Sequence, residues 1–190
     1  MIQAFVFDCF GVLYNDAFKD FLQRNAGKVG DRAAYLQDLC NQSDAGLISN
    51  EQFYGELAAI SGENPIDLYA DFHSKRHLNR QLIGLIRELK PRYKIGMLSN
   101  SGRDFLDEFI AEHDIASDFD VTIASSETGY IKPQREIFEI LAERLGLPLG
   151  DIYFVDDSPS NVQAAQGYGM QAHIYTSVDE LKTAIASLLT

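Results

Sequence analysis

The chain has 190 residues, of which 46% are hydrophobic and 23% charged, so its length allows one compact domain with a substantial insertion. This composition excludes disorder and collagen-like repeats. Its 28 acidic and 16 basic residues give a formal net charge of −12, which disfavours nucleic acid and anionic membrane surfaces as partners. We find no apolar run near the roughly 20 residues that cross a bilayer, and the N-terminus lacks the features of a signal peptide. We therefore expect a cytoplasmic protein.

Five short apolar runs predict buried parallel strands, because they are continuous rather than alternating. The runs are 2–7, 93–98, 119–124, 152–155 and 172–175, of which 119–124 is the weakest. Helical patterns lie between them around 82–89, 137–145 and 178–188. Strands that alternate with helices predict a layered α/β fold with a Rossmann-like parallel sheet.

Several residues mark helix starts just after the predicted strands. Ser101 and Ser177 stand three residues before an acidic residue, which is the spacing of a capping box, and Pro133 and Pro159 suit a first helical position. In open α/β sheets, ligands bind in the crevice beyond the carboxyl ends of the strands, where helix N-termini favour anions. We therefore expect the chemistry at this edge.

The segment from about 16 to 75 breaks the alternation. It holds four helical patterns, around 18–22, 35–39, 53–57 and 68–72, and no convincing strand. The spacing of its apolar residues favours the core of a helical bundle over a cofactor site. We interpret the segment as an all-helical insertion after the first strand.

Polar residues follow the first two long apolar runs directly. Asp8 comes after the first strand, which places a carboxylate at the carboxyl edge of the sheet. Ser99 and Asn100 end the second, where their hydroxyl, amide and backbone N–H groups can bind an anion. Taken separately, each of these residues can equally be a turn or helix cap.

Lys132 and an acidic pair extend the same pattern. A cation just before a helix is unfavourable for the helix dipole, so binding an anion would explain Lys132. Asp156 and Asp157 follow a buried strand and repel each other unless a cation joins them. Such hard oxygen ligands suit Mg²⁺.

Taken together, these motifs make the chain resemble the haloacid dehalogenase-like (HAD) hydrolase superfamily over nearly its whole length. The resemblance implies that Asp8 is a nucleophile, that Ser99 and Lys132 bind the transferred group, and that Asp156 with Asp157 holds Mg²⁺.

The resemblance also implies two further roles. Asn100 would help to bind phosphate, and the metal would take Asp8 and the backbone carbonyl of Phe10 as ligands. It further implies a HAD-like α/β core formed by residues 1–14 and 80–190, with a helical cap over 15–79.

The chain departs from the usual phosphatase pattern at Phe10. Most phosphatases of this superfamily carry a second Asp there, which protonates the leaving oxygen and later activates water; a phenyl ring transfers no proton. Haloacid dehalogenases also lack an acid at this position, so carbon–halogen cleavage is an alternative. That reaction needs no Mg²⁺, and the pair at 156 and 157 argues against it, because adjacent carboxylates near Asp8 repel one another without a cation.

We therefore predict a Mg²⁺-dependent phosphatase that hydrolyses a small phosphorylated metabolite through an aspartyl-phosphate, with a sugar phosphate as one candidate. Such a substrate would have a good leaving group, or the insertion would supply an acid. The candidate acids in the chain are Tyr14, Asp16, His73 and His77. A binding or regulatory protein that keeps the fold with weak turnover is a further alternative, and Phe10 is the feature that supports it.

Overall fold

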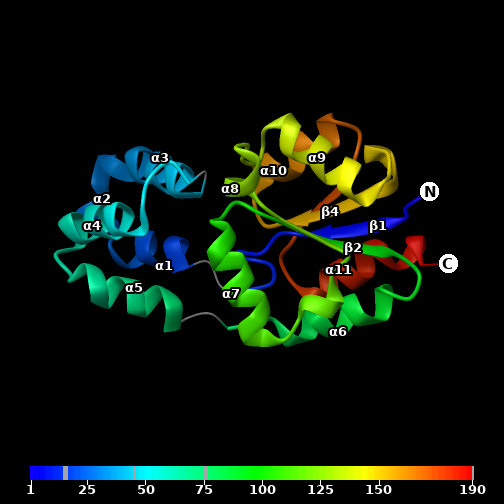
Figure 1. The fold of residues 1–190 in the computed structure, drawn as a ribbon, viewed down its shortest axis with the longest axis horizontal. Helices are drawn as coiled ribbons and strands as arrows, with labels where there is room; N and C mark the ends of the chain where they lie inside the picture. Colours follow the sequence, from blue (N-terminus) through cyan, green and yellow to red (C-terminus); the bar gives the residue numbers. More distant parts are fainter. Residues whose placement is uncertain (15–16, 45, 75–76, 190) are drawn as a thin grey trace.

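The computed structural model describes residues 1–14, 17–44, 46–74 and 77–189. Five parallel strands form one sheet in the order β3-β2-β1-β4-β5 (Figure 1). The strands are β1 (Ala4–Phe7), β2 (Lys94–Ser99), β3 (Val121–Ala124), β4 (Ile152–Asp156) and β5 (Gln171–Ile174). The predicted α/β fold with a Rossmann-like parallel sheet is confirmed. The central strand β1 pairs with β2 on one side and β4 on the other, so the chain order switches there, where α/β sheets bind ligands.

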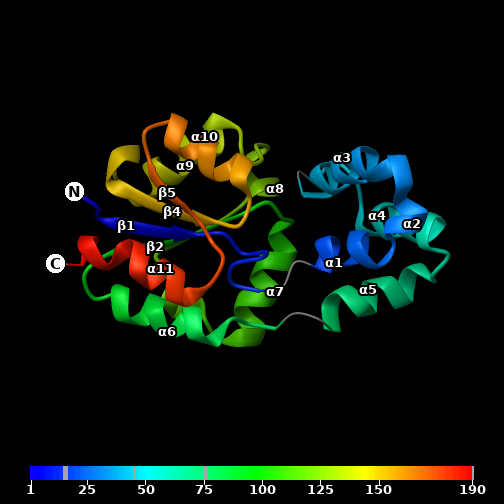
Figure 2. The same ribbon diagram turned by 180° about the vertical axis from the view of Figure 1, so that it is seen from behind.

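Helices cover both faces of the sheet (Figures 1 and 2). One face carries α6 (Arg80–Leu89), α7 (Arg103–His113) and α11 (Val178–Ile185), and the other carries α9 (Arg135–Leu145) and α10 (Pro159–Gly167). Phe5 and Phe7 of β1 pack in the first core, whereas Ala4 and Val6 pack in the second. Because both faces of a strand are buried, the strands have continuous apolar sequences.

The predicted helix starts are correct at two positions and wrong at two. Pro159 is the first residue of α10, and the Ser177 hydroxyl accepts the first-turn bond from the Glu180 N–H, at 3.2 Å. Ser101 does not cap α7, whose N-cap is Gly102; Ser101 is buried, and its N–H donates to Ser125 Oγ at 3.0 Å. Pro133 lies in a turn ahead of α9, which begins only at Arg135.

The insertion after β1 forms a second group of helices, which we call the helical lobe. It contains α1 (Ala17–Arg24), α2 (Ala26–Val29), α3 (Ala33–Asp44), α4 (Asn50–Ser61) and α5 (Pro65–Ser74), around a hydrophobic core of its own. The four helical patterns expected here correspond to α1, α3, α4 and α5. The lobe lies beyond the carboxyl edge of the sheet, on the side opposite the two termini (Figures 1 and 2).

The remaining elements are short. They are α8 (Ser125–Thr128) and the 3-10 turns Gly30–Arg32, Ala116–Asp118, Leu149–Asp151 and Ala186–Leu188. In the described part of the chain, no helix combines the length and the hydropathy of a membrane span.

Candidate active site

Three carboxylates meet where β1 and β4 end. The register pairs Phe7 with Val155, so the next residues along each strand, Asp8 and Asp156, emerge side by side. Asp157 follows directly, and one oxygen from each of the three side chains lies within 4.8 Å of the others. The structure therefore brings together the three acidic residues that sequence reasoning proposed.

Lys132 joins two of these carboxylates. Its Nζ lies 2.7 Å from Oδ1 of Asp8 and 2.7 Å from Oδ2 of Asp156, and the lysine is 3% exposed. A buried ammonium held by two carboxylates is strongly oriented, because water does not compete for it. Lys132 thus supplies a positive charge at a fixed position in the site.

Asn100 positions Lys132 through the backbone. Its Oδ1 accepts the Lys132 N–H at 2.8 Å, and its Nδ2 donates to the Lys132 carbonyl at 3.0 Å. Both halves of the side-chain amide therefore fix the lysine-bearing turn. Asn100 also lines the cleft described below, and its proposed contact with phosphate stays a prediction.

Asp156 is held from several directions. Asn161 Nδ2 lies 3.1 Å from both oxygens of Asp156, and the Ser158 N–H donates to Oδ1 at 2.8 Å. Sequence reasoning gave Asn161 no role. Its position in the first turn of the helix that follows the acidic pair was the available signal, because that turn faces the end of β4.

The site carries more negative than positive charge. Burial raises the pKa of Asp8 well above its ordinary value, and Asp156 and Asp157 raise it further, while Lys132 lowers it. Burial also raises the pKa of Asp157. For Lys132, burial alone would lower the pKa, but the charges of Asp156 and Asp8 outweigh this effect and raise it. The buried Lys132 and the more exposed Lys19 face three carboxylates, so the site still favours additional positive charge.

The donor set fits Mg²⁺. Three carboxylates at one point supply the hard oxygen ligands that this ion prefers. The ion would also lower the repulsion that raises the pKa of Asp8.

Gly11 packs directly against the acidic pair, a contact that sequence reasoning did not identify. The residue has φ +76°, and a Cβ built on it would lie 2.3 Å from Oδ2 of Asp157. Only glycine allows both this backbone conformation and this close approach. A glycine three residues after a strand-end aspartate was the signal in the sequence.

Two serine hydroxyls near the site are buried without a hydrogen-bond partner among the described residues, Ser99 Oγ and Ser101 Oγ. Ser99 is the last residue of β2 and is fully buried, whereas Ser101 contributes to the cleft described below. An unpaired buried hydroxyl is costly unless a ligand satisfies it. The Ser101 hydroxyl, at the cleft, therefore suits the binding of an anion, whereas Ser99 is enclosed behind the cleft wall and does not line it.

Phe10 lies in the loop after Asp8, where its ring stacks on Phe105 at 5.1 Å and contacts Tyr14 at 4.9 Å. Of the candidate acids, Tyr14 is buried against this ring, and His73 contacts Tyr69 at 3.9 Å between ring centroids. His77 lines a separate pocket, and Asp16 lies outside the described residues.

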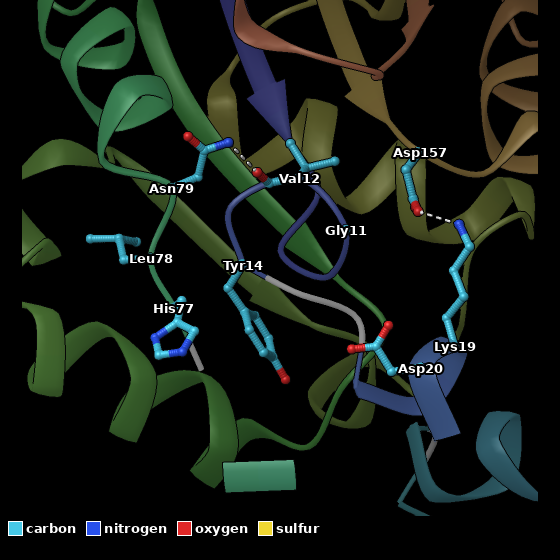
Figure 3. Close-up of a pocket in the computed structure, with 9 residues that line it drawn as sticks. All are labelled: Gly11, Val12, Tyr14, Lys19, Asp20, His77, Leu78, Asn79 and Asp157. Carbon is cyan, nitrogen blue, oxygen red and sulfur yellow. Dashed lines mark hydrogen bonds and ion pairs between the residues drawn. The ribbon is translucent and has the colours of Figure 1, made fainter. Parts of the chain in front are cut away.

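Two hollows adjoin the carboxylates. The larger, of about 1160 Å³, runs between the helical lobe and the sheet and is lined by Asp8, Lys132 and Asp157 among others. The smaller, of about 580 Å³, is shown in Figure 3 beside the loop that follows β1. Asp157 lines both, and there it forms an ion pair with Lys19 of α1 at 3.4 Å (Figure 3). Lys19, which sequence reasoning missed, thus connects the lobe to the acidic cluster.

Comparison with known families agrees with this geometry. The sequence matches the family described as haloacid dehalogenase-like hydrolase over residues 2–169. The chain therefore belongs to the HAD-like hydrolases, and the resemblance inferred from its motifs is confirmed.

Individual relatives include phosphatases. The sesquiterpene phosphatase astK of Aspergillus oryzae is 28% identical over 88% of this chain and 87% of its own length. The drimenol cyclase drtB of Aspergillus calidoustus is 21% identical over 99% of this chain, which spans only 37% of that protein. Among solved structures, a HAD family enzyme from Bacteroides thetaiotaomicron, in complex with magnesium and inorganic phosphate, has a TM-score of 0.71 at 22% identity, covering 95% of this chain and 99% of its own. This last likeness establishes the fold.

Proposed function

We propose that this protein is a Mg²⁺-dependent phosphatase that transfers the phosphoryl group of a small phosphorylated metabolite to Asp8 and then to water. The observation that carries the proposal is the meeting of Asp8, Asp156 and Asp157 around a buried Lys132. Its phosphatase relative and the phosphate complex of a protein with the same fold support it.

Asp8 would attack phosphorus through Oδ2. Its Oδ1 accepts from the Cys9 N–H and from Lys132 Nζ, both at 2.7 Å, which fixes the carboxylate so that its second oxygen serves as the nucleophile. The bond from Oδ2 to phosphorus forms as the bond from phosphorus to the leaving oxygen breaks, giving an aspartyl-phosphate that water hydrolyses.

Lys132 and the two serines would bind the phosphoryl oxygens. The transition state of phosphoryl transfer is loose, so the protein's contribution is positioning and electrostatic stabilisation. The ammonium of Lys132 is already oriented, and the unpaired hydroxyls of Ser99 and Ser101 supply further donors.

The proposed metal ligands are Asp8, Asp156, Asp157 and the backbone carbonyl of Phe10. When bound, Mg²⁺ would neutralise charge on the phosphoryl oxygens. Both oxygens of Asp156 already have partners in Lys132 and Asn161. This arrangement favours Asp157 for the closer contact with the ion and Asp156 for holding Lys132.

The helical lobe would act as the cap, over the proposed range 15–79, and would close the cleft over the substrate. It already contacts the core near the site, through the Lys19–Asp157 ion pair and through Ser125 Oγ, which donates to the Asp44 carbonyl at 2.5 Å.

Phe10 favours a second candidate, a HAD-fold protein with weak turnover, because no acid stands at that position to protonate the leaving oxygen. Hydrolysis of p-nitrophenyl phosphate separates the two, since its phenolate leaves without much protonation. We expect Mg²⁺-dependent release of p-nitrophenol that Asp8→Asn abolishes. Failure of the wild type to release it, with Mg²⁺ saturating, would favour the binding protein.

A halide-release assay addresses dehalogenation. Halide release from 2-chloropropionate without Mg²⁺ would indicate carbon–halogen cleavage by Asp8. We expect none, because the three clustered carboxylates supply the oxygen ligands of a divalent cation, which carbon–halogen cleavage does not need.

A further inference from the structure

The larger cleft continues from the carboxylates into the space beneath the helical lobe. Asp8, Lys132 and Asp157 stand at its inner end, and α1, α3, α4 and α5 supply its outer walls. At about 1160 Å³, it is larger than a phosphate group requires. The rest of the substrate therefore lies against the lobe.

Aromatic rings form the wall next to Asp8. Phe10 and Phe105 stack at 5.1 Å, and both are only partly buried, so apolar ring surface faces the cleft. Tyr14 packs against both rings, at 4.9 Å and 5.9 Å. The atoms of a substrate that adjoin its phosphate would meet hydrocarbon surface first.

The lobe continues this apolar surface. Phe18 of α1 is partly buried and lies 6.1 Å from Phe53 of α4 between ring centroids. Other apolar residues lining the lobe side are Leu22, Ile48, Tyr54, Tyr69 and Phe72.

The charged lining opposes a second anionic group on the substrate. Asp44, Asp104 and Glu108 line the cleft away from the carboxylate cluster, whereas its lysines, Lys19 and Lys132, both pair with that cluster. A second carboxylate or phosphate would face acidic side chains.

From this lining we infer that the substrate is a phosphomonoester with a single anionic group whose alcohol portion is a hydrocarbon, seated between Phe10, Phe105 and Phe18. Because an alkoxide is a poor leaving group, its oxygen would take a proton from an acid of the lobe, for which His73 is the candidate that lines this cleft.

The inference rests on the proposed phosphatase function. It disfavours a sugar phosphate because the rings next to Asp8 offer few hydrogen bonds to hydroxyls that adjoin the phosphate, although Gln37, Asn41 and Asn50 of the lobe also line the cleft farther out.

A series of n-alkyl phosphonates from ethyl to octyl tests the inference without relying on turnover of the probe, because their P–C bond is not hydrolysed. They are used as competitive inhibitors of p-nitrophenyl phosphate hydrolysis by the Mg²⁺-loaded enzyme. Each methylene buried should lower the inhibition constant by about fourfold. Inhibition constants that do not change with chain length, or glucose 1-phosphate binding more tightly than octyl phosphonate, would overturn the inference.

A pair of substitutions tests whether the alkyl chain binds against Phe18. Phe18→Gln should raise the inhibition constant of octyl phosphonate by about tenfold and change that of ethyl phosphonate by no more than about twofold. Only the longer chain reaches the lobe. Ile66→Gln is the control, because Ile66 is also in the lobe but is 75% exposed and not part of the cleft. Equal effects of the two substitutions on the binding of octyl phosphonate, in variants that circular dichroism shows to be folded, would contradict the proposed position of the hydrocarbon chain.

Failure of this inference and failure of the phosphatase proposal give different results. If p-nitrophenyl phosphate is not hydrolysed, the function fails, and calorimetric titration of the alkyl phosphonates still measures the dependence on chain length. If hydrolysis occurs but affinity is independent of chain length, only the hydrocarbon inference fails.

Discussion

Gly11 and Asp157 are in contact so close that no side chain fits between them: a Cβ on Gly11 would lie 2.3 Å from Oδ2 of the carboxylate. The loop after β1 and the end of β4 are thereby packed together at the metal-binding position that we propose. The contact also fixes where Asp157 stands relative to Asp8.

Gly11→Ala should therefore weaken Mg²⁺ binding by more than tenfold, because the added methyl group displaces the Asp157 carboxylate. The left-handed backbone at φ +76° adds strain of roughly 1–2 kcal/mol. Gly62→Ala is the matched control, since Gly62 has φ +74° and a Cβ placed there would have no atom within 4 Å. Isothermal calorimetry with Mg²⁺ measures the difference, and equal affinity in the two variants would refute the role given to Gly11.

Lys132→Met should lower the free energy of unfolding by about 3–5 kcal/mol, because it leaves the buried Asp8 and Asp156 carboxylates without their counter-charge. Lys90→Met removes the ammonium of a more exposed pair with Asp120, at 2.9 Å, and should cost about 0–1 kcal/mol. Urea unfolding in the presence of EDTA measures the free energy of unfolding of the two variants. Similar costs would show that Lys132 is not the buried counter-charge of the site.

Ser99→Ala should separate stability from function. The Ser99 hydroxyl is buried without a partner in the described residues, so its removal should leave the melting temperature unchanged or raise it, while KM for p-nitrophenyl phosphate rises about tenfold.

Ser125→Ala provides the contrast for that experiment. Ser125 Oγ accepts the Ser101 N–H and donates to the Asp44 carbonyl, so this substitution should destabilise the protein by about 1–3 kcal/mol. A loss of stability in Ser99→Ala as large as in Ser125→Ala would mean that the Ser99 hydroxyl serves the fold rather than phosphate.

Phe10→Asp should increase kcat/KM for ethyl phosphate by about 100-fold, because it restores a proton donor beside the leaving oxygen. Phe10→Asn is the control, since it makes the same change in size and in the ring contacts with Phe105 and Tyr14 without a proton to transfer. The absence of a gain over Phe10→Asn would show that the missing acid does not limit the reaction.

Much of the fold was predictable from the sequence, for a local physical reason. The central strands β1, β2 and β4 are buried on both faces, so each contains a largely apolar run, and the lobe helices bury one stripe each, so each shows helical spacing. The edge strand β5 is partly exposed along its length. The errors at Ser101 and Pro133 are shifts of one or two residues, because Gly102 is the N-cap of α7 and Gln134 the N-cap of α9.

The site residues that directly follow a strand were predictable from the sequence. The contacts between segments that are distant in the sequence were not. Asp8 and Asp156 follow from the register of β1 and β4. By contrast, the bonds of Asn100 to Lys132, the ion pair of Lys19 with Asp157 and the packing of Gly11 each join parts of the chain whose proximity depends on the tertiary fold. No local spacing in the sequence encodes them.

The central claim, that Asp8 receives the phosphoryl group, is tested most directly by acid-quenching the Mg²⁺-loaded enzyme during turnover of a ³²P-labelled aryl phosphate and mapping the labelled peptide. We expect an acid-stable, hydroxylamine-sensitive label on Asp8 that is absent without Mg²⁺ and in Asp8→Asn. Turnover that proceeds equally well in Asp8→Asn, or a label on another residue, would contradict the account.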